Sequence, residues 1–245
     1  MKKYYACEKN YYTHWRPHIF FQICRGLVFI FYPAYKTVWM TSNQESEAIY
    51  VANHSKIHGP LYAMLDFPKK MRIWGDGPLC FLNQAHDYIM ENFFPTHLKK
   101  QYHFYSFLAY ILAPMMVAIF KGAEIIPVFR GPDLLITFRK TVETLKEGKN
   151  IFLFAECPTR YNKYINEFNR GFVQVGRVIN SLMKKRIPFY PVYVCASLKT
   201  TLIGEPIYYN PELKPDEQTE AICKYLQDEI TKMALTLPDH KVVNF

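Results

Sequence analysis

Residues 48–54 read AIYVANH, and this short stretch decides how the whole chain is interpreted. Its first five residues are apolar and rich in strand-forming types, which predicts a buried strand. Asn53 and His54 follow directly, so two polar side chains stand where that strand ends. Open α/β sheets build their sites at the carboxyl ends of such strands. A functional site at this point is therefore the first hypothesis.

Strand-like and helix-like segments alternate along the remainder of the chain. Further strands are expected at residues 71–74, 123–129, 150–154, 188–195 and 206–209. Helices are expected from the turn after His54 through residue 65, and at residues 133–148, 172–184 and 215–235. This alternation predicts an α/β fold in a single domain, with a mostly parallel sheet flanked by helices.

The composition favours a chain that meets a lipid surface. The formal net charge is +9, and the sequence contains 19 Tyr, 19 Phe and 3 Trp residues. A basic chain attracts either nucleic acid or an anionic membrane, and Tyr and Trp suit a membrane interface. The basic residues flank apolar segments, as Lys2, Lys3 and Arg16 do, and form no stripe interleaved with aromatics. A membrane partner is therefore expected and a nucleic-acid partner is not, while the oligomeric state stays open.

Two strongly apolar segments stand out, at residues 19–35 and 101–120. The first is interrupted by Arg25 and is short for a span of ~20 apolar residues. It predicts an N-terminal helix that lies at a membrane interface or covers the core, and no signal peptide. The second is long enough to span, but Pro114 and its place between polar clusters favour a buried or half-inserted helical hairpin. The expected division is a membrane-associating helical segment at residues 1–40 and an α/β domain at residues 41–245.

The cysteines and histidines do not indicate a metal site. Six cysteines are scattered without a C-x-x-C pair, a usage typical of a reducing cytoplasm rather than of a disulfide framework or zinc site. His54 and His58 are four residues apart, but no third ligand accompanies them. Cys157 is interpreted as a small packing residue, because no dedicated base accompanies it.

Three polar clusters fall where predicted strands end. They are residues 53–60 (NHSKIHGP), 122–131 (GAEIIPVFRG) and 154–160 (FAECPTR). A histidine can take a proton from an alcohol, and arginine side chains can hold a phosphate. The clusters together therefore indicate a site for a substrate that carries both groups.

In these clusters the chain resembles the glycerolipid acyltransferase family, whose best-known members acylate 1-acylglycerol-3-phosphate. The matching positions are Asn53, His54 and Pro60; Gly122 and Arg130; Phe154, Glu156, Thr159 and Arg160; and the strands at residues 187–192 and 204–207. The resemblance covers about residues 45–210. It depends on the order and spacing of the blocks, since each block alone is weak.

The resemblance implies a membrane-associated transferase of phospholipid biosynthesis at the cytoplasmic membrane face. Such an enzyme moves an acyl group from a thioester of coenzyme A or acyl carrier protein to the hydroxyl of a lysophospholipid. It implies His54 as general base, with Arg130, Glu156 and Arg160 forming the phosphate pocket. Asn53, His58 and Asp66 are possible auxiliary residues. Neither a metal nor a bound cofactor is implied, because the acyl donor is a co-substrate.

The first block departs from the family at Gly59, where family members carry Asp. In a His–acid pair the carboxylate fixes the tautomer and stabilises the imidazolium, and losing it costs about 10⁴ in rate in the serine-protease triad. Three explanations stay open. Another acid, namely Asp66, Asp76 or Glu156, supplies the carboxylate; or His58, on the same helical face, assists; or the protein is a weak or inactive relative that binds lipid.

Simpler interpretations of the same residues are also weighed. His54 can be a structural histidine at a helix start, and Arg130 can be a solvated residue at the end of a strand. Glu156 and Arg160, four residues apart, can form a local ion pair. The acceptor can also be a glycolipid or an amine-bearing lipid instead of a lysophospholipid.

Overall fold

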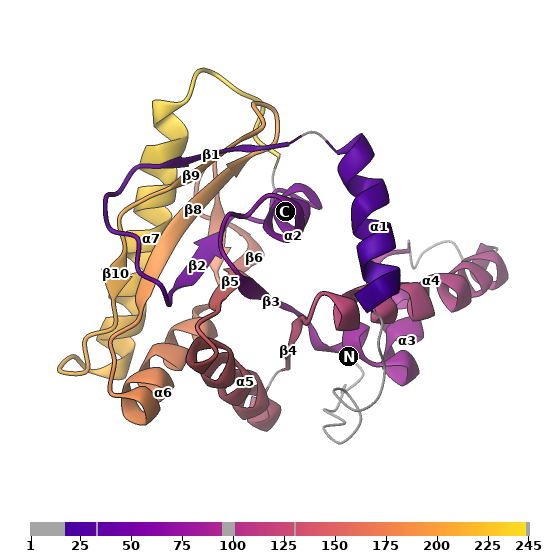
Figure 1. Cartoon of the computed structure of the whole chain (residues 1–245), viewed down its shortest axis with the longest axis horizontal. Coiled ribbons are helices and arrows are strands. Elements are labelled where there is room, and N and C mark those ends of the chain that lie inside the picture. The colour runs from indigo at the N-terminus through magenta and orange to yellow at the C-terminus, as the bar shows by residue number, and fades with distance from the viewer. Residues whose placement is uncertain (1–17, 33, 95–100, 130, 244–245) are drawn as a thin grey trace. The chain divides into compact units, whose positions relative to one another are not determined.

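The computed structural model describes residues 18–32, 34–94, 101–129 and 131–243 (Figure 1). The chain divides into two compact units. Unit 1 comprises residues 1–31 and 74–137, and unit 2 comprises residues 32–73 and 138–245. Strand β3 and helix α5 each begin in one unit and end in the other.

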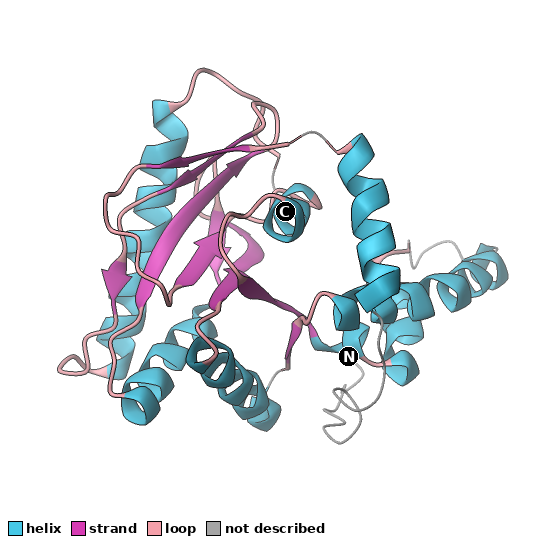
Figure 2. Cartoon of the chain, in the orientation of Figure 1, coloured by secondary structure: helices cyan, strands magenta, loops and turns pink. Residues whose placement is uncertain are grey.

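Most of the sheet belongs to unit 2 and is mainly parallel (Figure 2). The strand order is β1-β9-β8-β2-β5-β3-β4, with β10 paired to β8. All pairings along this order are parallel except β8 with β9, and β10 is antiparallel to β8. The strands are β1 (Lys36–Trp39), β2 (Ile49–Ala52), β3 (Met71–Asp76), β4 (Ile126–Val128), β5 (Asn150–Phe154), β8 (Pro188–Cys195), β9 (Thr200–Ile203) and β10 (Ile207–Tyr208).

Strand β2 lies at the centre of the unit 2 sheet because both of its edges are paired. Ile49 stands opposite Ile151 of β5 on one side and Phe189 of β8 on the other. All four residues of β2 and all eight of β8 are buried. Helices α2 (His58–Leu65) and α7 (Pro215–Thr236) pack against β8 from opposite sides (Figure 1). Strands covered on both faces read as continuous apolar runs, which is why these two were predictable.

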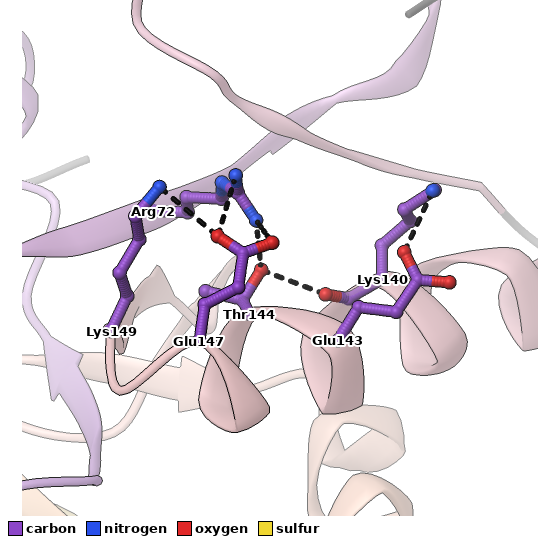
Figure 3. Close-up of polar contacts among 6 residues, drawn as sticks. All are labelled: Arg72, Lys140, Glu143, Thr144, Glu147 and Lys149. Carbon is purple, nitrogen blue, oxygen red and sulfur yellow. Dashed lines mark hydrogen bonds and ion pairs between the residues drawn. The ribbon is translucent and has the colours of Figure 1, made fainter.

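Two further helices are α5 (Leu134–Lys146) and α6 (Gln174–Met183). A network of polar side chains connects α5 to β3 (Figure 3). The guanidinium of Arg72 donates to Thr144 Oγ1 at 3.0 Å and to Glu147 Oε1 at 3.1 Å. Lys149 Nζ lies 3.2 Å from Glu147 Oε2. Burial alone would raise the pKa of Glu147, but hydrogen bonds from Arg72 and Lys149 lower it on balance. The network therefore holds the last turn of α5 against the edge of the sheet.

Unit 1 is mainly helical. Its helices are α1 (His18–Phe31), α3 (Leu82–Asn92) and α4 (Tyr102–Gly122), with 3-10 turns at Gly77–Cys80 and Gly131–Asp133. Helix α4 packs against α1 and α3, and its buried side consists largely of small residues such as Ala109 and Ala113. Several of its large side chains point outward, and Phe104, Phe107 and Tyr110 are exposed. Helix α4 thus buries small side chains and exposes large apolar ones over part of its surface.

The predicted fold class is confirmed: the sheet is mostly parallel, helices flank it, and an apolar helix stands near the N-terminus. The helical hairpin predicted at residues 101–120 is wrong, because α4 runs through Pro114 without a break. Proline removes one backbone hydrogen bond, and packing on two neighbouring helices compensates for that loss. The predicted division at residue 40 stays a prediction.

Five elements were not predicted, and they share a weak sequence signal. The edge pair β1 and β9 is short, helix α3 is polar on most of its surface, and β6 (Glu156–Arg160) pairs with β7 (Asn166–Phe168) in a separate hairpin. Strand β6 contains Pro158 and three exposed residues, a pattern that does not indicate a strand.

The network at β3 gives the first prediction. Arg72→Met should lower the free energy of unfolding by about 1 kcal/mol, mainly through loss of the bond to the buried Thr144, since Glu147 is half exposed. Lys140→Met is the matched control, because Lys140 pairs with Glu143 on the surface of the same helix and its loss should cost less than about 0.5 kcal/mol. Urea denaturation measures both, and equal losses would contradict the role given to Arg72.

Candidate active site

The loop that follows β2 carries His54 in a tight turn at the carboxyl end of the strand. Ser55 and Lys56 adopt left-handed backbone conformations, with φ of 48° and 55°. The turn is closed by hydrogen bonds from the His58 N–H to the Ser55 carbonyl and from the Gly59 N–H to the His54 carbonyl, both at 3.1 Å. Helix α2 begins only at His58. The expectation that His54 and His58 share a helical face is therefore wrong, because two left-handed residues separate them.

Asn53 fastens the start of this loop to the neighbouring strand. Its side-chain amide donates to the Val194 carbonyl at 3.1 Å, and its Oδ1 accepts from the Val194 N–H at 2.6 Å. The side chain thus continues the β2–β8 ladder by one step beyond the last backbone pair. Asn53 is buried, so both of its polar atoms need such partners. The asparagine sets the position from which His54 leaves the sheet.

Glu156 joins the third cluster to the first. Its Oε2 accepts a short hydrogen bond from the His54 N–H, and its Oε1 accepts from the Asn166 N–H at 2.9 Å. Burial raises the pKa of this carboxyl, while the hydrogen bonds from His54 and Asn166 partly offset that shift. The carboxylate therefore links the His54 loop to the β6–β7 hairpin through backbone groups.

Gly59 is required by the close approach of the chain to itself. A Cβ atom at this position would lie 2.5 Å from the His54 carbonyl oxygen and 2.7 Å from the Phe154 ring. The ring of Phe154 also lies 5.0 Å, centroid to centroid, from the imidazole of His54. The place where a carboxylate would stand is thus taken by a phenyl ring and a backbone carbonyl.

The remaining predicted residues lie in several places. Arg160 is exposed in the β6–β7 hairpin and donates to the carbonyls of Asn162 and Lys163, both at 3.4 Å. Asp66 Oδ2 accepts from the Tyr35 N–H at 3.0 Å. Asp76 belongs to unit 1, and Arg130 lies outside the described residues, so its phosphate role stays a prediction.

A cluster beside the loop was not predicted. The Nδ1 atom of His58 lies 3.3 Å from the hydroxyl of Tyr32 and 3.4 Å from that of Tyr35. Lys199 Nζ lies over both phenol rings, 5.8 Å and 5.6 Å from their centroids. We call these four residues the Tyr–His–Lys cluster. Its members come from three separate parts of the sequence, and Lys199 is a single lysine in the turn after β8, which gives no signal in the sequence.

The comparisons with known proteins add one distant likeness. No protein-family model matches the chain, and a search of curated protein sequences found no match. Among solved structures, the chain is similar to the crystal structure of the 1-acyl-sn-glycerophosphate (LPA) acyltransferase PlsC from Thermotoga maritima. The sequences are 14% identical, the TM-score is 0.42, and the match covers 91% of this chain and 80% of that one. The chemistry of the site is therefore inferred from its own residues.

Gly59→Ala should lower the free energy of unfolding by about 2 kcal/mol, because its methyl group would overlap the His54 carbonyl and the Phe154 ring. Gly171→Ala is the matched control, since the nearest atom to a Cβ there is 3.7 Å away. Gly59→Asp should be at least as destabilised and should not increase activity. Thermal unfolding measures all three, and a Gly59→Ala protein as stable as the parent would contradict this packing.

Glu156→Gln should also destabilise the fold, because an amide can accept only one of the two backbone bonds and turns an N–H toward the other. The expected loss is about 1–3 kcal/mol. Glu167→Gln, on β7 of the same hairpin, is the control, because the Glu167 carboxylate accepts a long bond of 3.4 Å from the Gln227 side chain and no backbone bond within the described residues.

The pH dependence gives a second readout for Glu156. The carboxyl group of Glu156 binds a proton more tightly in the folded chain than in the unfolded chain, because its pKa is raised in the fold. Stability contributed by the protonated group is full below the unfolded pKa and is lost as pH rises through the folded pKa. The difference in the free energy of unfolding between the parent and Glu156→Gln should therefore become smaller as pH rises. A difference that grows with pH would contradict the environment assigned to Glu156.

Proposed function

We propose that this chain is an acyltransferase that moves a fatty acyl group from a thioester to the hydroxyl of a lysophospholipid. His54 removes the proton from the acceptor hydroxyl, and the oxygen forms a bond to the thioester carbonyl carbon. The C–S bond breaks, and the departing thiolate takes up the proton. The acyl donor is a thioester of coenzyme A or of acyl carrier protein, and 1-acylglycerol-3-phosphate is the expected acceptor.

The bond from Glu156 to the His54 N–H is the observation that supports this proposal most directly. It brings together two sequence blocks that are about a hundred residues apart, and both belong to the resemblance stated from the sequence. The His54 loop stands at the carboxyl end of a central parallel strand, where such sheets place their sites. Because both oxygens of Glu156 accept backbone bonds, we assign this residue to positioning the loop rather than to holding phosphate.

We further infer that unit 1 associates with the membrane on its cytoplasmic face. Helix α4 is long and apolar enough to span a bilayer, yet only 22% of its apolar stretch is buried inside the protein. Helix α1 exposes Ile19, Ile23, Leu27 and Ile30. Exposed apolar surface of this extent is typical of a site of interaction, and exposed aromatic residues suit a lipid interface. A lipid substrate would then be reached from the membrane in which it resides.

Gly59 favours a second candidate function. A relative that lacks the acid partner of its histidine can keep the fold, bind lipid and have no catalytic activity. In that case His54 would be a structural residue at the start of a helical turn. The two candidates differ in one measurable respect, which is the dependence of acyl transfer on the imidazole of His54.

His54→Ala should lower the rate of acyl transfer to lysophosphatidate by about 10²- to 10⁴-fold, the range expected for loss of a general base. His103→Ala is the matched control, because this histidine is exposed at the start of α4. The assay uses the full chain with anionic phospholipid vesicles and acyl-coenzyme A. Equal background-level transfer by the parent and His54→Ala would support the non-catalytic alternative.

A further inference from the structure

The Tyr–His–Lys cluster contains a positive charge that the fold does not neutralise. Lys199 is half-buried in the turn between β8 and β9, and its φ is 50°. Within the described parts of the chain, no carboxylate forms an ion pair with it. Its ammonium instead lies over the rings of Tyr32 and Tyr35, which stack at 5.6 Å with planes 8° apart. Cation–π contact holds the charge in place without cancelling it.

The same cluster allows His58 to present a hydrogen-bond donor through Nε2. The Tyr32 hydroxyl donates to the His58 carbonyl at 3.3 Å, and the hydroxyl groups of Tyr32 and Tyr35 both lie within hydrogen-bond distance of Nδ1. The Tyr35 hydroxyl can donate to Nδ1 when that nitrogen carries no proton. The neutral ring then carries its proton on Nε2. Burial lowers the pKa of His58, and the nearby Lys199 lowers it further. Nε2 has no hydrogen-bond partner among the residues that the structure describes.

This cluster stands at the same end of the sheet as His54. His58 opens α2 immediately after the His54 turn, and the next residue, Gly59, donates to the His54 carbonyl. Lys199 follows β8, whose Val194 holds Asn53. The backbone bond from Lys36 to the Lys199 carbonyl, at 2.9 Å, ties this turn to β1. The cluster therefore lies at the end of the sheet where the loop with the proposed base begins.

We propose that Lys199 and the Nε2–H of His58, framed by Tyr32 and Tyr35, form a binding subsite for a phosphate group of one of the two substrates. The inference rests on the proposed function, because both a lysophospholipid acceptor and a coenzyme A or acyl-carrier donor bear phosphate. An ammonium supplies a point charge, and an imidazole N–H supplies a directed donor. The two phenol rings limit the movement of the lysine side chain.

Lys199→Met tests this subsite because it removes the charge and keeps most of the apolar stem. It should raise the KM of the substrate whose phosphate binds there about tenfold, the effect of one charge-assisted hydrogen bond, and leave the KM for uncharged monoacylglycerol unchanged. Lys199→Arg should retain most of the affinity. Lys69→Met is the matched control, since Lys69 also lies over an aromatic ring, 5.0 Å from the Trp39 centroid, but precedes β3 at the opposite end of the parallel strands.

The outcomes separate the two sources of phosphate. A rise in the KM for lysophosphatidate alone assigns the subsite to the acceptor, and a rise in the KM for acyl-coenzyme A alone assigns it to the donor. If neither KM changes in Lys199→Met, or if Lys69→Met changes them equally, the subsite does not exist as proposed.

A binding experiment decides the question even if the parent transfers no acyl group. The ring signals of His58 are followed by NMR while sn-glycerol 3-phosphate or adenosine 3′,5′-bisphosphate is added to the full chain. Either probe should shift the His58 signals and raise its pKa, because a bound anion favours the charged ring. The shift should be absent with glycerol or adenosine and in Lys199→Met. Parent signals that respond to neither phosphate probe would overturn the inference and leave the proposed function untouched.

Discussion

The carboxylate of Glu156 is the constraint on which the geometry of the site depends. It is half-buried, and its two oxygens accept from the backbone N–H groups of His54 and Asn166. A buried carboxylate is unfavourable unless such donors surround it. The donors must therefore keep their positions, and with them the His54 turn and the β6–β7 hairpin. A single side chain thus fixes the backbone of the turn that carries His54.

The same turn explains why residue 59 is a glycine. With Ser55 and Lys56 in left-handed conformations, the chain folds back so closely that residue 59 meets the carbonyl of His54. A side chain there would require a wider loop. The wider loop would in turn displace the His54 N–H from Glu156. Gly59 and the bond to Glu156 are therefore two parts of one arrangement, and a glycine at this position is a consequence of the loop shape.

An element of the fold could be predicted from the sequence where its burial leaves a regular apolar pattern. Strands β2, β5 and β8 are covered on both faces, so their apolar runs were visible in the sequence. The grouping of Asn53, His54 and Glu156 followed from the rule that parallel strands end at a common edge. The sequence did not predict which groups the Glu156 carboxylate contacts. Those contacts depend on the β6–β7 hairpin, and its polar, proline-containing strand β6 was not predicted. Lys199 was overlooked because an isolated lysine in a turn has no periodic signal.

The way α4 resembles a lipid-facing helix also limits how it can lie in a membrane. Its buried side holds Ala109 and Ala113, while Phe107 and Tyr110 face outward, the reverse of a helix in a water-soluble core. Pro114 cannot donate to the carbonyl of Tyr110, four residues earlier. In the hydrocarbon core an unsatisfied carbonyl is costly, whereas at the headgroup level water can bond to it. If unit 1 associates with the membrane as proposed, the proline and the exposed Tyr110 one turn before it favour an interfacial position for this part of α4 over a full crossing.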